Sequence, residues 1–179
     1  MTEPGMRRSA TPGQHTTMGI RTLTYKELSE IDQLSFKANS ILTEARQRLA
    51  SYDWDLAVRG AQEAVELYTK TLFRFIGREY PPSHDLSKGE GIGKNTIYEM
   101  SALLEGYGVE RPEVARLVLA NSTLGAWRSS AFYGDERLGV AKVFRQKEAE
   151  VAVGLAQEVM FTCEKVRGVL YRRAKNPSS

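Results

Sequence analysis

Cysteine and histidine are scarce in this chain of 179 residues, which has one cysteine and two histidines. A single cysteine excludes an internal disulfide, and this fits a reducing cytoplasm. The two histidines, His15 and His84, lie far apart in the sequence, and together with the one cysteine they lack the ligand spacing of a metal site. We therefore expect a cytoplasmic protein that holds no metal and no other cofactor.

Long apolar runs are also missing. No run approaches the roughly 20 apolar residues of a membrane helix, so we expect no membrane-spanning segment. The N-terminal segment is polar, contains several Gly, Pro and Thr, and lacks the apolar stretch of a secretory signal. We interpret residues 1–22 as a disordered leader, 23–175 as a single helical domain and 176–179 as a flexible tail.

The charge balance is only mildly basic. The formal net charge is +3, whereas a dedicated nucleic-acid binder concentrates more cations on one face. The clearest cluster is "KVRGVLYRRAK" at 165–175. Cations are favoured at the C-terminal end of a helix by its dipole, and this explains the cluster without a ligand. A phosphate-binding tail is the alternative.

Helical periodicity dominates the rest of the chain. Apolar residues at steps of three and four predict a helix over 25–50, with Thr24 and Glu27 forming a capping box at its start. A second helix is expected over 54–76, after a short turn in which Asp53 can act as the N-cap. Two long helices joined by so short a turn must lie antiparallel.

The second half of the sequence continues this pattern after a loop. Residues 78–95 carry two prolines and several glycines, and "GEGIGKN" within them lacks the spacing and the preceding strand of a phosphate-binding P-loop. Helices are then expected over 96–105 and from Pro112 into "WRSSAFYG". The last helix, 146–173, repeats small and branched residues about every 3.5 positions and places Cys163 in the core.

No segment alternates as a strand does, so the sequence predicts an all-α fold. The stretch 51–89 resembles the HEPN family (higher eukaryotes and prokaryotes nucleotide-binding domain), prokaryotic type, and the resemblance covers about residues 30–170. The resemblance rests on "YD" at the first turn, on a second helix with Gln, Ala, Glu, Lys and Leu in the order Q-x-A-x-E-x-x-x-K-x-L, and on "HDL" in a proline-containing loop. These features fall on Tyr52, Asp53, Gln62, Ala64, Glu66, Lys70, Leu72, Pro82, His84, Asp85 and Leu86.

The resemblance implies a four- to five-helix up-and-down bundle that commonly forms a homodimer. It also implies an association with RNA or nucleotides, because many members cleave RNA or pair with a minimal nucleotidyltransferase in toxin–antitoxin systems. Other members keep the fold without the nuclease activity.

Catalytic members carry an arginine and a histidine with four to six residues between them. An imidazole can move a proton near neutral pH, and a guanidinium can stabilise charge on phosphorus. Here Arg128 takes the arginine position and Tyr133 stands where the histidine would be. A phenol with a pKa of about 10 is a poor base at pH 7, although it can bind a phosphate or donate a proton. We therefore expect little or no catalysis.

Two further groups are candidates for ligand binding. His84 in "PSHDL" could present an imidazole, but a His-Asp pair in a loop more commonly stabilises a turn. On the second helix, Glu66 and Lys70 lie on the face opposite the apolar stripe, with Gln62 at its edge. That face is either solvated or a ligand or dimer surface; its other charged members are Arg59 and Glu63.

Three functions remain open from the sequence. The favoured one is a non-catalytic or weakly active protein that binds RNA or a nucleotide, or pairs with a nucleotidyltransferase. The second is a metal-independent ribonuclease toxin that uses Tyr133 or His84 as its base. The third is a structural homodimer in which Arg128 only pairs with Asp135 or Glu136.

Overall fold

A computed structural model describes residues 21–80, 96–133 and 144–176 of the chain, without the side chains of 96–99 and 129–133. These ranges contain five α-helices and no strand. The helices are α1 (Tyr25–Ala50), α2 (Trp54–Phe75), α3 (Thr96–Leu104), α4 (Arg111–Tyr133) and α5 (Gln146–Lys175), with one 3-10 turn, η1 (Glu105–Tyr107). Residues 1–20 of the expected leader, the "GEGIGKN" segment and residues 177–179 lie outside the described residues.

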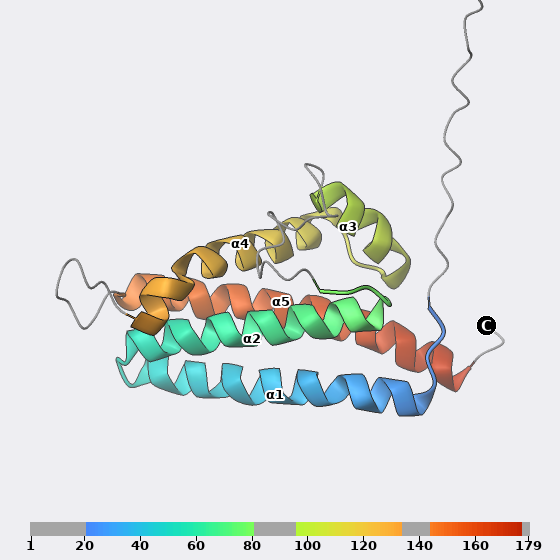
Figure 1. The fold of residues 1–179 in the computed structure, drawn as a ribbon, viewed down its shortest axis with the longest axis horizontal. Helices are drawn as coiled ribbons and strands as arrows, with labels where there is room; N and C mark the ends of the chain where they lie inside the picture. The colour runs from blue at the N-terminus through green and yellow to red at the C-terminus, as the bar shows by residue number, and fades with distance from the viewer. Residues whose placement is uncertain (1–20, 81–95, 134–143, 177–179) are drawn as a thin grey trace, which may run out of the picture.

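The four long helices run alternately up and down (Figure 1). Helices α2 and α5 pack against each other, and each also contacts α1 and α4. Helix α1 therefore covers one side of the α2–α5 pair and α4 covers the other, while α3 packs against α4 (Figure 1). This arrangement confirms the predicted all-α, up-and-down bundle.

The helix ends follow local rules at most positions. Thr24 and Glu27 form the predicted capping box, in which the Thr24 side chain accepts from the Glu27 amide and the Glu27 carboxylate accepts from the Thr24 amide. Helix α2 ends one residue before the predicted boundary, and Gly77 follows with a φ of 71° that glycine adopts without strain. The last helix continues two residues beyond the predicted Arg173, to Lys175.

The prediction that the Asp53 side chain caps α2 is wrong. Asp53 does occupy the N-cap position of α2, but its side chain makes no capping hydrogen bond. Its carboxylate Oδ2 lies 3.6 Å from a guanidinium nitrogen of Arg48 instead. The preceding Tyr52 has a φ of 63°, so the chain reverses between the helices through a left-handed residue that is not glycine.

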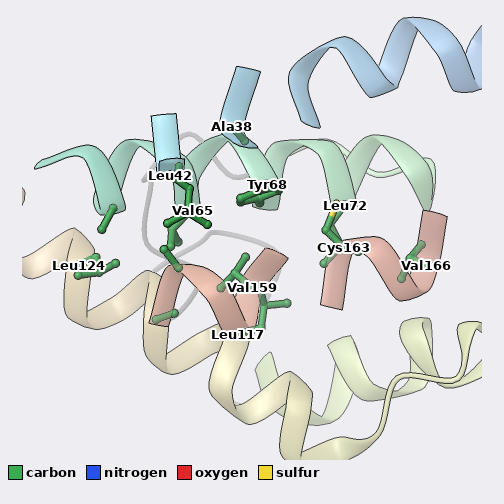
Figure 2. Packing of buried hydrophobic residues seen from close by; sticks show 14 of the residues in the cluster. Ala38, Leu42, Val65, Tyr68, Leu72, Leu117, Leu124, Val159, Cys163 and Val166 are labelled. Carbon is green, nitrogen blue, oxygen red and sulfur yellow. The ribbon is translucent and has the colours of Figure 1, made fainter. Parts of the chain in front are cut away.

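One core joins the four long helices (Figure 2). Leu42 from α1, Leu72 from α2 and Leu117 from α4 are fully or almost fully buried, and they meet the small and branched residues of α5. Cys163 lies in this core as predicted, and burial raises the pKa of its thiol to about 12. The thiol is therefore a packing group rather than a reactive one.

Helices α1 and α2 approach closely because Gly60 faces Ala45. A Cβ atom added at Gly60 would lie 3.0 Å from the Cβ of Ala45, which is closer than normal packing allows. On α5, by contrast, a Cβ added at Gly154 would meet no atom within 4 Å.

Substitution of these two glycines should therefore have opposite effects. We expect Gly60→Leu to lower the free energy of unfolding by about 1–3 kcal/mol, because it overpacks the α1–α2 contact. The matched control Gly154→Leu should raise it by about 0.5–1 kcal/mol, because it replaces a poor helix former in open space. Urea unfolding followed by far-UV circular dichroism measures both, and equal effects would contradict the close approach of the two helices.

Candidate anion-binding site

Three polar residues of α2 lie on one side of the helix because they are spaced four residues apart: Gln62, Glu66 and Lys70. Glu66 is the middle one and contacts both others. Its Oε1 accepts a hydrogen bond of 2.6 Å from the Lys70 ammonium, and its Oε2 accepts a long one of 3.5 Å from the Gln62 amide. Gln62 is buried, whereas Lys70 is partly exposed.

Arg128 reaches the same carboxylate from α4. Its Nη1 lies 3.9 Å from Oε2 of Glu66, which is an ion pair but too long for a hydrogen bond. The Arg128 side chain is 43% exposed, whereas that of Glu66 is only 17% exposed. Two cations therefore face one shielded carboxylate. The Arg128 guanidinium lies farther from it than the Lys70 ammonium does and is also more exposed to solvent.

A buried hydrogen bond links α4 to α2. The Asn121 side-chain amide donates to the hydroxyl of Thr69 at 3.1 Å and to the carbonyl of Leu117 at 2.9 Å. Asn121 lies two helical turns before Arg128 and on the same side of α4. Because the two helices are antiparallel, this contact places Arg128 beside the segment of α2 that precedes Thr69, where Glu66 lies.

Tyr80 is a neighbour of this cluster that the sequence reasoning did not single out. The Lys70 ammonium lies 5.5 Å from the centroid of the Tyr80 ring, within the range of a cation–π contact. The ring also packs edge-on against Phe73 at a centroid distance of 5.7 Å. Tyr80 follows the end of α2 in a stretch without helical periodicity, so no local signal points to this contact.

Four of the six predicted site residues therefore meet at one place. The cluster brings together Gln62, Glu66, Lys70 and Arg128. The face of α2 that carries the first three is not fully solvated, because α4 covers part of it. The imidazole of His84 and the phenol of Tyr133 lie outside the described side chains, although the backbone of Tyr133 ends α4.

The predicted alternative in which Arg128 pairs with Asp135 or Glu136 also concerns residues outside the described ranges. Within those ranges Arg128 forms its ion pair with Glu66. The arginine of the motif is therefore tied to the polar cluster of α2.

The cluster combines two cations with one carboxylate that partly neutralises them, which makes it a candidate anion site. Lys70 holds the Glu66 carboxylate at hydrogen-bond distance, so Arg128 keeps donor groups that can bind a phosphate oxygen. In the described part of the chain no group of three or more His, Cys, Asp or Glu residues is placed to hold a metal ion. None of the described helices is both long and apolar enough to cross a membrane.

The described residues form an all-α up-and-down bundle with an arginine late on α4 and an E-x-x-x-K pair on α2. Comparison with known families matches residues 31–166 to the HEPN domain, so the chain belongs to the HEPN family. This is a superfamily of nucleotide-binding and ribonuclease-like domains that commonly dimerise. Comparisons with curated proteins and with solved structures gave no match.

The two ion pairs of Glu66 should differ in strength. A double-mutant cycle with Glu66→Gln and Lys70→Met should give a coupling of about 0.5 kcal/mol, typical of an i,i+4 ion pair on a helix. The cycle with Glu66→Gln and Arg128→Met should give a smaller coupling, because its 3.9 Å separation allows no hydrogen bond. Urea unfolding measures both couplings, and a larger value for the Arg128 pair would show that Arg128 is held structurally by Glu66.

Proposed function

We propose that this HEPN protein binds RNA or a nucleotide through Arg128 and has little or no nuclease activity. The observation that carries the proposal is the placement of Arg128. Its guanidinium is almost half exposed and only loosely paired, and the carboxylate beside it is already hydrogen-bonded to Lys70. A phosphate can therefore bind Arg128 without removing a tightly bonded partner from it.

The neighbouring groups add to this binding surface. Lys70 supplies a second positive charge within the cluster, and Gln62 fixes Glu66 from the buried side. We place Glu66 as the residue that orients Lys70 and limits the net charge of the site. His84 and Tyr133 remain candidate contacts on the strength of the family resemblance alone.

Family membership supports two further parts of the proposal. HEPN domains commonly dimerise, so we propose a homodimer. The prokaryotic HEPN pattern in the sequence also favours pairing with a minimal nucleotidyltransferase, as in toxin–antitoxin systems.

Arg128→Ala tests the binding site. We expect it to weaken the binding of a labelled single-stranded RNA by about tenfold, because a charge-assisted contact to phosphate contributes roughly 1.5 kcal/mol or more. The slope of log affinity against log salt should also become shallower by about 0.7, the value for one phosphate contact to a single strand. Fluorescence anisotropy at several salt concentrations gives both quantities.

Arg116→Ala is the matched control. Arg116 is on the same helix, and its side chain, 48% exposed, pairs with Glu158 at 3.1 Å. This substitution removes the same charge from the protein but not from the cluster, so we expect a much smaller effect on RNA affinity. If both variants lose affinity equally, net charge rather than Arg128 accounts for the binding.

The chemistry assigned to the motif is tested by restoring the imidazole. We expect the native chain to cleave RNA slowly or not at all, and Tyr133→His to raise the cleavage rate about tenfold or more, because a positioned general acid or base contributes on the order of 100-fold or more. Cleavage of a fluorogenic RNA in the presence of a chelator measures this. Cleavage by the native chain that is lost in Arg128→Ala would instead identify an active ribonuclease.

A further inference from the structure

Four flat side chains form a continuous row along the seam between α1 and α5. Tyr25 packs edge-on against Tyr171 at a centroid distance of 6.0 Å and an interplanar angle of 67°. The Arg167 guanidinium carbon lies 5.3 Å from the Tyr171 ring centroid and 5.8 Å from that of Phe36. We call this row of Tyr25, Tyr171, Arg167 and Phe36 the aromatic ladder.

A buried carboxylate holds the middle of the ladder in place. The side chain of Asp32 is only 3% exposed and accepts from Arg167 Nε at 3.0 and 3.1 Å, and it also accepts from the Tyr171 hydroxyl. Burial and Asp32 both raise the pKa of Tyr171, so this phenol stays protonated and remains a donor. Glu164 accepts from the other side of the guanidinium at 3.0 Å. Ordering of these side chains is therefore achieved before any ligand binds.

The two ends of the ladder are open to solvent. Phe36 is 63% exposed and Tyr25 is 53% exposed, and both belong to α1. They are eleven residues apart, which is about three helical turns, or roughly 16 Å, on the same side of the helix. Isolated exposed aromatic residues are common. Here, however, the two exposed rings are joined through a fixed guanidinium and a third ring.

Positive charge follows Tyr171 directly along α5. The last turn of α5 carries Arg172, Arg173 and Lys175, all exposed. In the described part of the chain none of the three forms an ion pair, whereas Arg167 is offset by Asp32 and Glu164. The three cations at the end of α5 are therefore available to a ligand, and the ladder offers a flat surface.

We propose that the aromatic ladder and the end of α5 bind single-stranded nucleic acid. Unpaired bases stack on Phe36 and Tyr25, and phosphates contact the cations of the last turn. A single strand is the polymer that combines exposed π-faces with a negative charge at each step, which is why such surfaces combine aromatic residues with cations. A duplex offers no free base faces and should bind this surface poorly.

This surface is separate from the Arg128 cluster. Helix α1 lies on one side of the α2–α5 pair and α4 lies on the other, so the ladder and Arg128 are on different faces of the bundle (Figure 1). The class of ligand, RNA, rests on the proposed function. The choice of residues that bind it does not.

The test uses the full chain and a labelled oligouridylate of about twelve nucleotides, a length within the range that single-strand-binding domains cover. We expect Phe36→Ser to weaken its binding about tenfold, since stacking of one base contributes roughly 1–3 kcal/mol. Tyr52→Asn is the control, because Tyr52 is 72% exposed at the α1–α2 turn, outside the ladder, and asparagine accepts its φ of 63°. This variant should bind as the native chain does.

The same measurement separates the two binding surfaces. If Phe36→Ser has no effect while Arg128→Ala weakens binding, the ladder is overturned and the Arg128 site stands. If Phe36→Ser weakens binding and Arg128→Ala does not, the ladder stands and the Arg128 site fails. Absence of binding by the native chain at low salt overturns both.

A second pair of variants tests whether stacking is the interaction. Phe36→Trp should keep the affinity, and the indole it introduces should be quenched when the oligouridylate is added. Phe36→Leu keeps an apolar side chain without a π-face and should lose about as much affinity as Phe36→Ser. If Phe36→Leu binds as tightly as the native chain, the contact is apolar rather than stacked, and the proposal is overturned.

Discussion

Helix α2 packs against three other helices at once, and the rest of the structure depends on this constraint. It contacts α1, α4 and α5, and more than half of its residues are buried. A helix enclosed in this way cannot keep a solvated polar face along its whole length. The hydroxyls of Thr69 and Thr71 therefore bond to carbonyls of their own helix at 2.7 and 2.8 Å, and Glu66 has partners both on α2, where Lys70 lies, and on α4, where Arg128 lies.

Glu66 needs partners because it is enclosed in this way, and it also belongs to the sequence pattern that resembles the HEPN family. Its carboxylate is largely shielded because α4 covers that side of α2, and it is accompanied by Lys70 and Arg128. A shielded carboxylate with two cations around it is stable as a unit and still carries a net positive charge. The same packing that buries the centre of α2 thus leaves a cation at its edge, so fold stability and the proposed anion binding would depend on the same residues.

The bundle itself could be predicted from the sequence because its signals are local. Capping by Thr24 and Glu27, the stop at Gly77 and the periodicity of α5 each depend on residues within a few positions of one another. Asp53 shows where such reasoning fails. Its position was right, but its carboxylate is taken by Arg48, a competitor that a capping rule does not consider.

The site was only partly predictable, for a different reason. Residues of one helix could be grouped by spacing, but the distance from Arg128 to Glu66 depends on how α4 crosses α2. Asn121 lies among buried apolar residues of α4, and no local pattern indicates its bond to Thr69 of α2. The aromatic ladder was missed altogether, because Phe36 and Arg167 belong to no shared pattern and meet only when α5 returns to α1.

The separation of Asp32 from its partners has a consequence for how the chain folds. The carboxylate and Arg167 are 135 positions apart, so a partly folded chain that has formed the α1–α2 hairpin must keep Asp32 hydrated until the last helix arrives. Desolvation of an unpaired charge is costly, and long loops close slowly. We therefore expect docking of α5 to be a late and cooperative step of folding, in which water leaves the seam only as the guanidinium enters it.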